Sequence, residues 1–219
     1  MPTQTADTTP SSQPHSRGLA LSLSKTLSMV CTPFYLPLLS MAAIFTFTHL
    51  YYLPLSYKLQ IALLTYLFTI FLPTLFIRAY RCYNGWTLFH LTMREKRMVP
   101  YITTIASYLA LYYIMRAMHT PSFMSYIIVS ALFVQRVCAL CNLVIKISIH
   151  TAGIGGLTGG VAAFSFILGF NATWWLILLI LLAGALGTAR MMLRVNTFAE
   201  VNLGFIVGLT TPFVVLMMI

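Results

Sequence analysis

A short polar segment, "KISIH" at residues 146–150, interrupts an otherwise apolar chain and directly precedes a glycine-rich run. Lys146 offers a compact positive charge that binds phosphate oxygens. The Ser148 hydroxyl can donate a hydrogen bond, and the His150 ring can act as a general acid or base. These three residue types in this order predict a site for an anion, for which a phosphate group is the natural candidate.

A second polar segment, "ARMMLRVNTFAE" at residues 189–200, lies between two apolar stretches. Arg190, Asn196 and Glu200 follow one another at spacings of six and four residues. The forked guanidinium of Arg190 suits a phosphate. Glu200 is a candidate to orient Asn196 or to activate a water molecule. The alternative is that Glu200 only pairs with Arg190 or Arg194.

A third basic segment, "REKRMVP" at residues 94–100, contains Arg94, Lys96 and Arg97. We predict that these three side chains contribute to phosphate binding. The alternative is a basic loop without a ligand, because basic residues collect in the cytoplasmic loops of membrane proteins.

The composition shows which kind of protein must position these segments. The chain is 59% hydrophobic and only 7% charged, and its mean hydropathy is +0.88. Soluble domains are about a quarter charged. We therefore predict an all-α, polytopic membrane helix bundle with six to seven transmembrane helices. The net charge of +10 then reflects basic loops, and no nucleic-acid partner is expected.

Apolar segments long enough to cross a bilayer, each about 18–25 residues, recur along most of the chain. They lie near 32–53, 58–79, 100–118, 122–146, 151–170, 173–191 and 200–219. The first 18 residues are polar and rich in Thr, Ser and Pro, which is typical of disorder. We predict a disordered tail over 1–30 and a transmembrane domain over 31–219.

With seven spans, the three basic segments all lie on one membrane face. The positive-inside rule places that face and the N-terminal tail in the cytoplasm. Three basic segments on one face would form a pocket suited to an anion at the bilayer surface.

Two spacing patterns indicate helix contacts. One is a stripe of polar residues at spacings of three and four, which we predict to follow one helix face. The stripe consists of Gln135, Cys138, Asn142, Lys146 and His150. The other is a set of pairs of small residues four apart, which let helices approach closely: Gly155/Gly159, Gly156/Gly160, Gly184/Thr188 and Gly204/Gly208. The glycines after His150 could also bring backbone close to an anion.

Cys138 and Cys141 are interpreted as packing residues, and no metal site is predicted.

The order of the three polar segments resembles the type 2 phosphatidic acid phosphatases, also called lipid phosphate phosphatases. Their motifs are Lys-x6-Arg-Pro, Pro-Ser-Gly-His and Ser-Arg-x5-His-x3-Asp. They are helical membrane proteins that cleave phosphate from lipids such as phosphatidic acid or polyprenyl diphosphate without a metal. The resemblance implies a phosphorylated membrane lipid as ligand, the lipid bilayer as surroundings, and no cofactor.

The resemblance extends from about residue 94 to residue 208, and its motifs are degenerate. Ser148 and His150 match the second motif, while isoleucines replace its Pro and Gly. Arg190 matches the third motif, and Glu200 replaces its Asp. The first motif loses its register, because Val99 precedes Pro100 where the family has Arg. The resemblance implies phosphate binding by Arg94, Lys96, Arg97, Lys146, Ser148 and Arg190, and catalytic positions at His150, Asn196 and Glu200.

Asn196 is the critical departure, because it stands where the family has its nucleophilic histidine. An amide nitrogen cannot accept a phosphoryl group in this way. We therefore expect a protein that binds or hydrolyses a phosphorylated lipid, with catalysis reduced or lost. Two alternatives stay open: slow direct hydrolysis through His150 and Glu200, and a non-enzymatic small transporter or membrane assembly subunit. The expected location is a bacterial inner membrane, and a homo-oligomer is left open.

Overall fold

The computed structural model describes residues 14–30, 35–47, 53–84 and 98–218, and all regular structure in these ranges is helical. The helices are α1 (Pro14–Val30), α2 (Leu36–Phe47), α3 (Leu55–Tyr66), the π-helical turn η3 (Leu67–Phe71), α4 (Leu72–Asn84), α5 (Met98–Ala117), α6 (Ser122–Val144), α7 (Ile149–Leu168), α8 (Thr173–Met192) and α9 (Phe198–Met218).

Five helices in the described ranges are long and apolar enough to cross a membrane: Leu55–Tyr83, which joins α3, η3 and α4, and then α6, α7, α8 and α9. The chain therefore has the architecture of a multi-pass membrane protein. In the predicted span near 32–53, the described residues form the 12-residue α2, which rises about 18 Å against a hydrocarbon thickness of about 30 Å. The six to seven spans stay a prediction.

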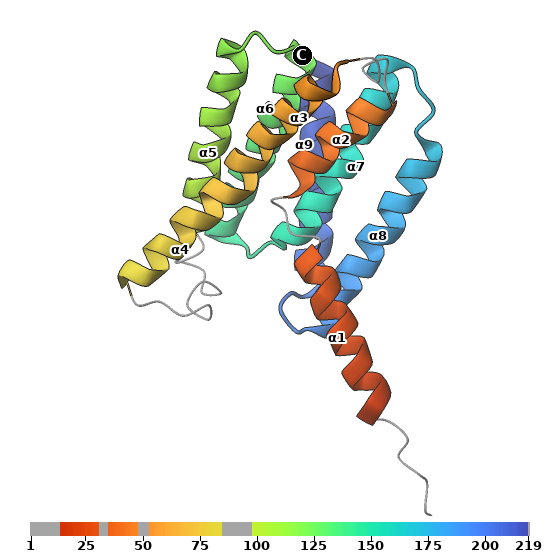
Figure 1. Cartoon of the computed structure of the whole chain (residues 1–219). Coiled ribbons are helices and arrows are strands. Elements are labelled where there is room, and N and C mark those ends of the chain that lie inside the picture. The colour runs from red at the N-terminus through yellow and green to blue at the C-terminus, as the bar shows by residue number, and fades with distance from the viewer. Residues whose placement is uncertain (1–13, 31–34, 48–52, 85–97, 219) are drawn as a thin grey trace, which may run out of the picture.

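The long helices run side by side, with their connections at two opposite ends (Figure 1). The α6–α7 turn and the α8–α9 turn lie at the same end as α1, and the C-terminus lies at the other end. The two polar segments that the sequence singled out, at 146–150 and 190–200, are therefore at one end of the bundle.

Helices α7 and α9 form the closest contact, and glycines make it possible. A Cβ atom on Gly155 would lie 2.5 Å from the backbone oxygen of Phe205, and one on Gly204 would lie 2.6 Å from the oxygen of Ser148. Gly159 and Gly208 meet the opposite backbone in the same way. The pairs Gly155/Gly159 and Gly204/Gly208 thus face each other across one interface, which fixes the start of α7 against the start of α9.

The other two predicted pairs do not make such contacts. A Cβ atom on Gly160 or Gly184 would meet no atom within 4 Å, and one on Gly156 would make only ordinary contacts. Spacing alone could not separate these pairs from the others, because it does not show which helix face has a neighbour.

The N-terminal region differs from the predicted disordered tail. Residues 14–30 form α1, while residues 1–13 lie outside the described residues. Ser24 and Ser28 are buried at the contact with α8, where the Ser24 hydroxyl lies 3.8 Å from the sulfur of Met192. Part of the predicted tail, including Ser24 and Ser28, therefore forms a helix face that packs on the bundle.

Candidate functional site

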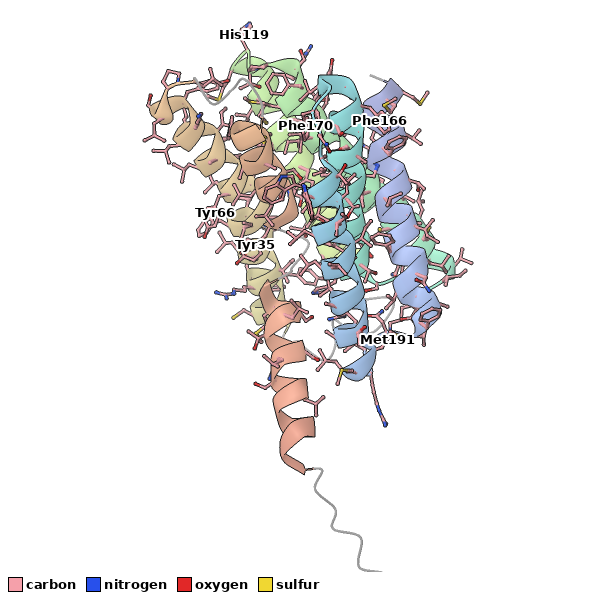
Figure 2. All side chains as sticks on the ribbon, turned by 90° about the vertical axis from the view of Figure 1, so that its right-hand side faces the viewer. Tyr35, Tyr66, His119, Phe166, Phe170 and Met191 are labelled. Atoms are coloured by element: carbon pink, nitrogen blue, oxygen red, sulfur yellow. The ribbon has the colours of Figure 1, made fainter. Side chains whose placement is uncertain are left out.

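The turns after α6 and after α8 lie against each other at one end of the bundle. Lys146 donates from Nζ to the backbone oxygen of Val195 at 2.6 Å and pairs with a carboxylate oxygen of Glu200 at 3.4 Å. The backbone N–H of Ser148 donates to the backbone oxygen of Glu200 at 3.1 Å. Figure 2 shows Met191 at this end and His119 at the opposite one. The structure thus brings together the first two polar segments of the sequence, at 146–150 and 189–200.

Arg190, Asn196 and Glu200 form one chain of hydrogen bonds. The Nε and Nη2 groups of Arg190 both donate to Oδ1 of Asn196 at 3.1 Å, and Nδ2 of Asn196 donates to Glu200 at 2.7 Å. Arg190 also donates from Nη1 to the hydroxyl of Ser28 at 3.0 Å. The spacings of six and four residues therefore place these three side chains in contact, although Ser28 could not be identified from them.

Glu200 also caps the first turn of α9. The backbone N–H of Thr197 donates to the Glu200 carboxylate, and the backbone N–H of Glu200 donates to the Thr197 hydroxyl, both at 3.3 Å. This reciprocal pattern is a capping box, for which Thr-x-x-Glu is the sequence signal. The sequence "TFAE" at 197–200 carried that signal, and it explains part of the role of Glu200 without a ligand.

The predicted polar stripe is wrong beyond Asn142. Helix α6 ends at Val144, and Ile145 is extended with φ −131° and ψ 134°. Lys146 lies in the connection and His150 in the first turn of α7, so neither continues the α6 face. The break is needed because α7 must turn back to pack on α9. Gln135, Cys138 and Asn142 do share a buried face of α6.

Ser148 is the N-cap residue of α7, but its side chain does not cap the helix. Its Oγ atom is buried and has no hydrogen-bond partner among the described residues, and the residue is 1% exposed. Its backbone oxygen accepts from the N–H of Ala152 and from the hydroxyl of Thr151, both at 3.0 Å. Buried hydroxyls are normally paired, so this orphaned donor at a helix N-terminus calls for an explanation.

The remaining predicted site residues are His150, Arg94, Lys96 and Arg97. His150 is half-buried in the first turn of α7. Arg94, Lys96 and Arg97 lie outside the described residues. Within the described ranges, no group of three or more His, Cys, Asp or Glu side chains is placed to hold a metal ion.

The glycines after His150 serve helix packing. Gly155 and Gly159 face the backbone of α9, so the predicted approach of their backbone to an anion is wrong for these two positions.

Comparison of this chain with protein-family models, with curated proteins and with solved structures found no match in any of the three.

Proposed function

We propose that this chain is an integral membrane protein of the lipid phosphatase type, which binds a phosphorylated lipid of the phosphatidic acid or polyprenyl diphosphate class with reduced or lost catalysis. The observation that carries the proposal is the contact between the turn at 146–150 and the turn at 190–200, through Lys146, Ser148 and Glu200. Two segments that resemble the phosphate-binding motifs of one family meet at one end of the helices.

The charge of this cluster favours an anion. Lys146, Arg190 and Arg194 carry three positive charges in or next to the two turns, while Glu200 is the only carboxylate side chain among the residues that the structure describes. The N-terminus of α7 adds the positive end of a helix dipole. The orphaned Ser148 hydroxyl supplies a further donor in the same turn. A phosphate oxygen would satisfy that donor and balance the excess positive charge.

The hydrogen bonds of Asn196 favour binding over hydrolysis. Its amide oxygen accepts from Arg190 and its amide nitrogen donates to Glu200, so it orders the two charged side chains and offers no nucleophile. The Glu200 carboxylate is already held by Asn196, by the Thr197 N–H and by Lys146. These contacts hold the carboxylate within the protein, which favours a role in ordering the turn over activation of a water molecule.

The proposal also includes the membrane setting. Six to seven helices cross a bacterial inner membrane, with the polar cluster and the basic turns on the cytoplasmic face. The apolar helices and the shared location of the two turns (Figure 1) are consistent with this arrangement.

Binding of phosphatidic acid to the purified protein tests the proposal. The parent protein should bind dioleoyl phosphatidic acid in nanodiscs more tightly than dioleoyl glycerol, and Arg190→Gln should weaken binding by about tenfold or more, as expected for a lost charge-assisted hydrogen bond. Ser28→Ala is the matched control, because it removes the same contact with α1 and keeps the guanidinium.

Arg194→Gln is a second control for general electrostatics, because Arg194 is exposed at the same end. Equal binding of phosphatidic acid by the parent and Arg190→Gln, or equal loss in Arg190→Gln and Ser28→Ala, would contradict the proposal. Transport of a solute into proteoliposomes without lipid binding would instead support the transporter alternative.

A further inference from the structure

A cavity of about 390 Å³ lies inside the bundle and is lined by residues of α2, α5, α6, α7, α8 and α9. It follows α7 from Ile149 to Phe164 and is lined mainly by apolar side chains. None of Lys146, Ser148, Arg190, Asn196 and Glu200 lines it. The cavity is therefore distinct from the polar cluster at the end of the bundle. Among the residues that the structure describes, no acidic, basic or histidine side chain contributes to its wall.

Several polar side chains line this mainly apolar space, and two of them, Tyr108 and Gln135, lie close together. Tyr108, near the middle of α5, is 1% exposed, and its hydroxyl has no hydrogen-bond partner among the residues that the structure describes. Gln135 of α6, a polar neighbour of Tyr108, also lines the cavity. Ser40, Ser130 and Trp175 line the cavity as well, and the Ser130 hydroxyl donates to the oxygen of Ile127 at 2.8 Å.

Polar groups within a transmembrane bundle are costly and usually serve a cavity, a partner or a ligand. The Tyr108 hydroxyl makes no hydrogen bond of ordinary length to the described residues, although the Gln135 side chain on α6 is close enough to interact with it. A phenol hydroxyl beside a side-chain amide can donate two hydrogen bonds to one oxygen atom.

We propose that this cavity is a binding site for a neutral, single-chain lipid that carries one hydrogen-bond-accepting oxygen, held by Tyr108 and Gln135. The absence of charged lining residues selects a neutral ligand. The volume is near the lower end of the range for ligand pockets, roughly 300–1,000 Å³, which suits one chain. This site stands independently of the proposed phosphate binding, since the two share no residue.

Photolabelling with a hexadecanol that carries a diazirine on its chain tests the site in the purified full-length protein. We expect labelled peptides from α6 or α7, with labelling competed by hexadecanol and not by hexadecane. Tyr108→Phe removes only the hydroxyl, and we expect it to weaken competition by hexadecanol by roughly 2–10-fold, as for one lost hydrogen bond.

Two glycine variants provide a matched pair. Gly160 lines the cavity and a Cβ atom there meets no atom within 4 Å, so Gly160→Leu should fill the space and abolish labelling. Gly184 is equally unobstructed, exposed and outside the cavity wall, so Gly184→Leu should label like the parent.

Equal competition by hexadecane would show a cavity open to any hydrocarbon chain and would overturn the proposal. Labelling of Tyr108→Phe with unchanged competition by hexadecanol would overturn it as well. If Gly160→Leu loses thermal stability, Tyr108→Phe decides the question, because it changes neither volume nor packing of the ring.

Discussion

The side-chain amide of Asn196 donates a 2.7 Å hydrogen bond to the carboxylate of Glu200. The two residues are one helical turn apart and have the spacing that histidine and aspartate have in the motif the chain resembles. Arg190 donates to the other end of the same amide. Asn196 is 7% exposed. Its buried amide therefore links the Arg190 guanidinium to the Glu200 carboxylate within the protein.

If the chain is of the proposed lipid phosphatase type, replacing Asn196 by histidine should place a candidate nucleophile here. Glu200 would accept from one ring nitrogen and leave the other for attack on phosphorus. We expect no phosphate release from phosphatidic acid by the parent and measurable release by Asn196→His, with Asn196→Ala as a control for a loosened network. Release by the parent that disappears in His150→Ala would instead establish direct hydrolysis.

Thr197→Ala should destabilise the protein through the start of α9. It removes the hydroxyl that accepts from the Glu200 N–H, and loss of an N-cap side chain costs about 1 kcal/mol. Thermal unfolding in detergent measures the change. Glu200→Gln is the comparison: glutamine still suits a capping box, and only the partly exposed pair with Lys146 is lost, which is worth about 0–1 kcal/mol. A larger loss for Glu200→Gln than for Thr197→Ala would show that the ion pair dominates.

Gly208→Ala should force α7 and α9 apart. An added Cβ atom would overlap the backbone of Ala152, which cannot move as a side chain can. Overpacking of this kind costs about 1–3 kcal/mol, and the transition temperature in detergent should fall. Gly184→Ala is the matched control, because a Cβ atom there meets nothing within 4 Å. Equal stability of the two variants would contradict the close packing of these helices.

Ser28→Ala should loosen α1 from the rest of the bundle. The Ser28 hydroxyl accepts a hydrogen bond from Arg190 across the contact with α8. Without it, α1 should open more often, and trypsin should cut after Lys25 faster than in the parent. Thr26→Ala is the control, because the Thr26 hydroxyl bonds only within α1, to the oxygen of Ser22 at 2.9 Å. Equal cleavage rates for both variants would show that this bond does not hold α1.

Local patterns in the sequence determined the helical architecture and part of the candidate site. Long apolar segments must form helices in a bilayer, because the backbone has to satisfy its own hydrogen bonds there. The four-residue spacing of Asn196 and Glu200 brings the two side chains together across one turn at the start of α9. The glycine pairs Gly155/Gly159 and Gly204/Gly208 were identified for the same reason, since residues four apart share a helix face.

Only the tertiary structure decided which of these faces meet. Helix α6 ends at Val144, so Lys146 lies outside the polar face of α6 and contacts Val195 and Glu200. The position of such a helix end depends on where the next helix packs. The bond between Arg190 and Ser28 joins residues far apart in the sequence, and the cavity beside Tyr108 exists only between packed helices. Periodicity shows which side of a helix is polar or small, but the neighbour of that side is set by the packing of the whole bundle.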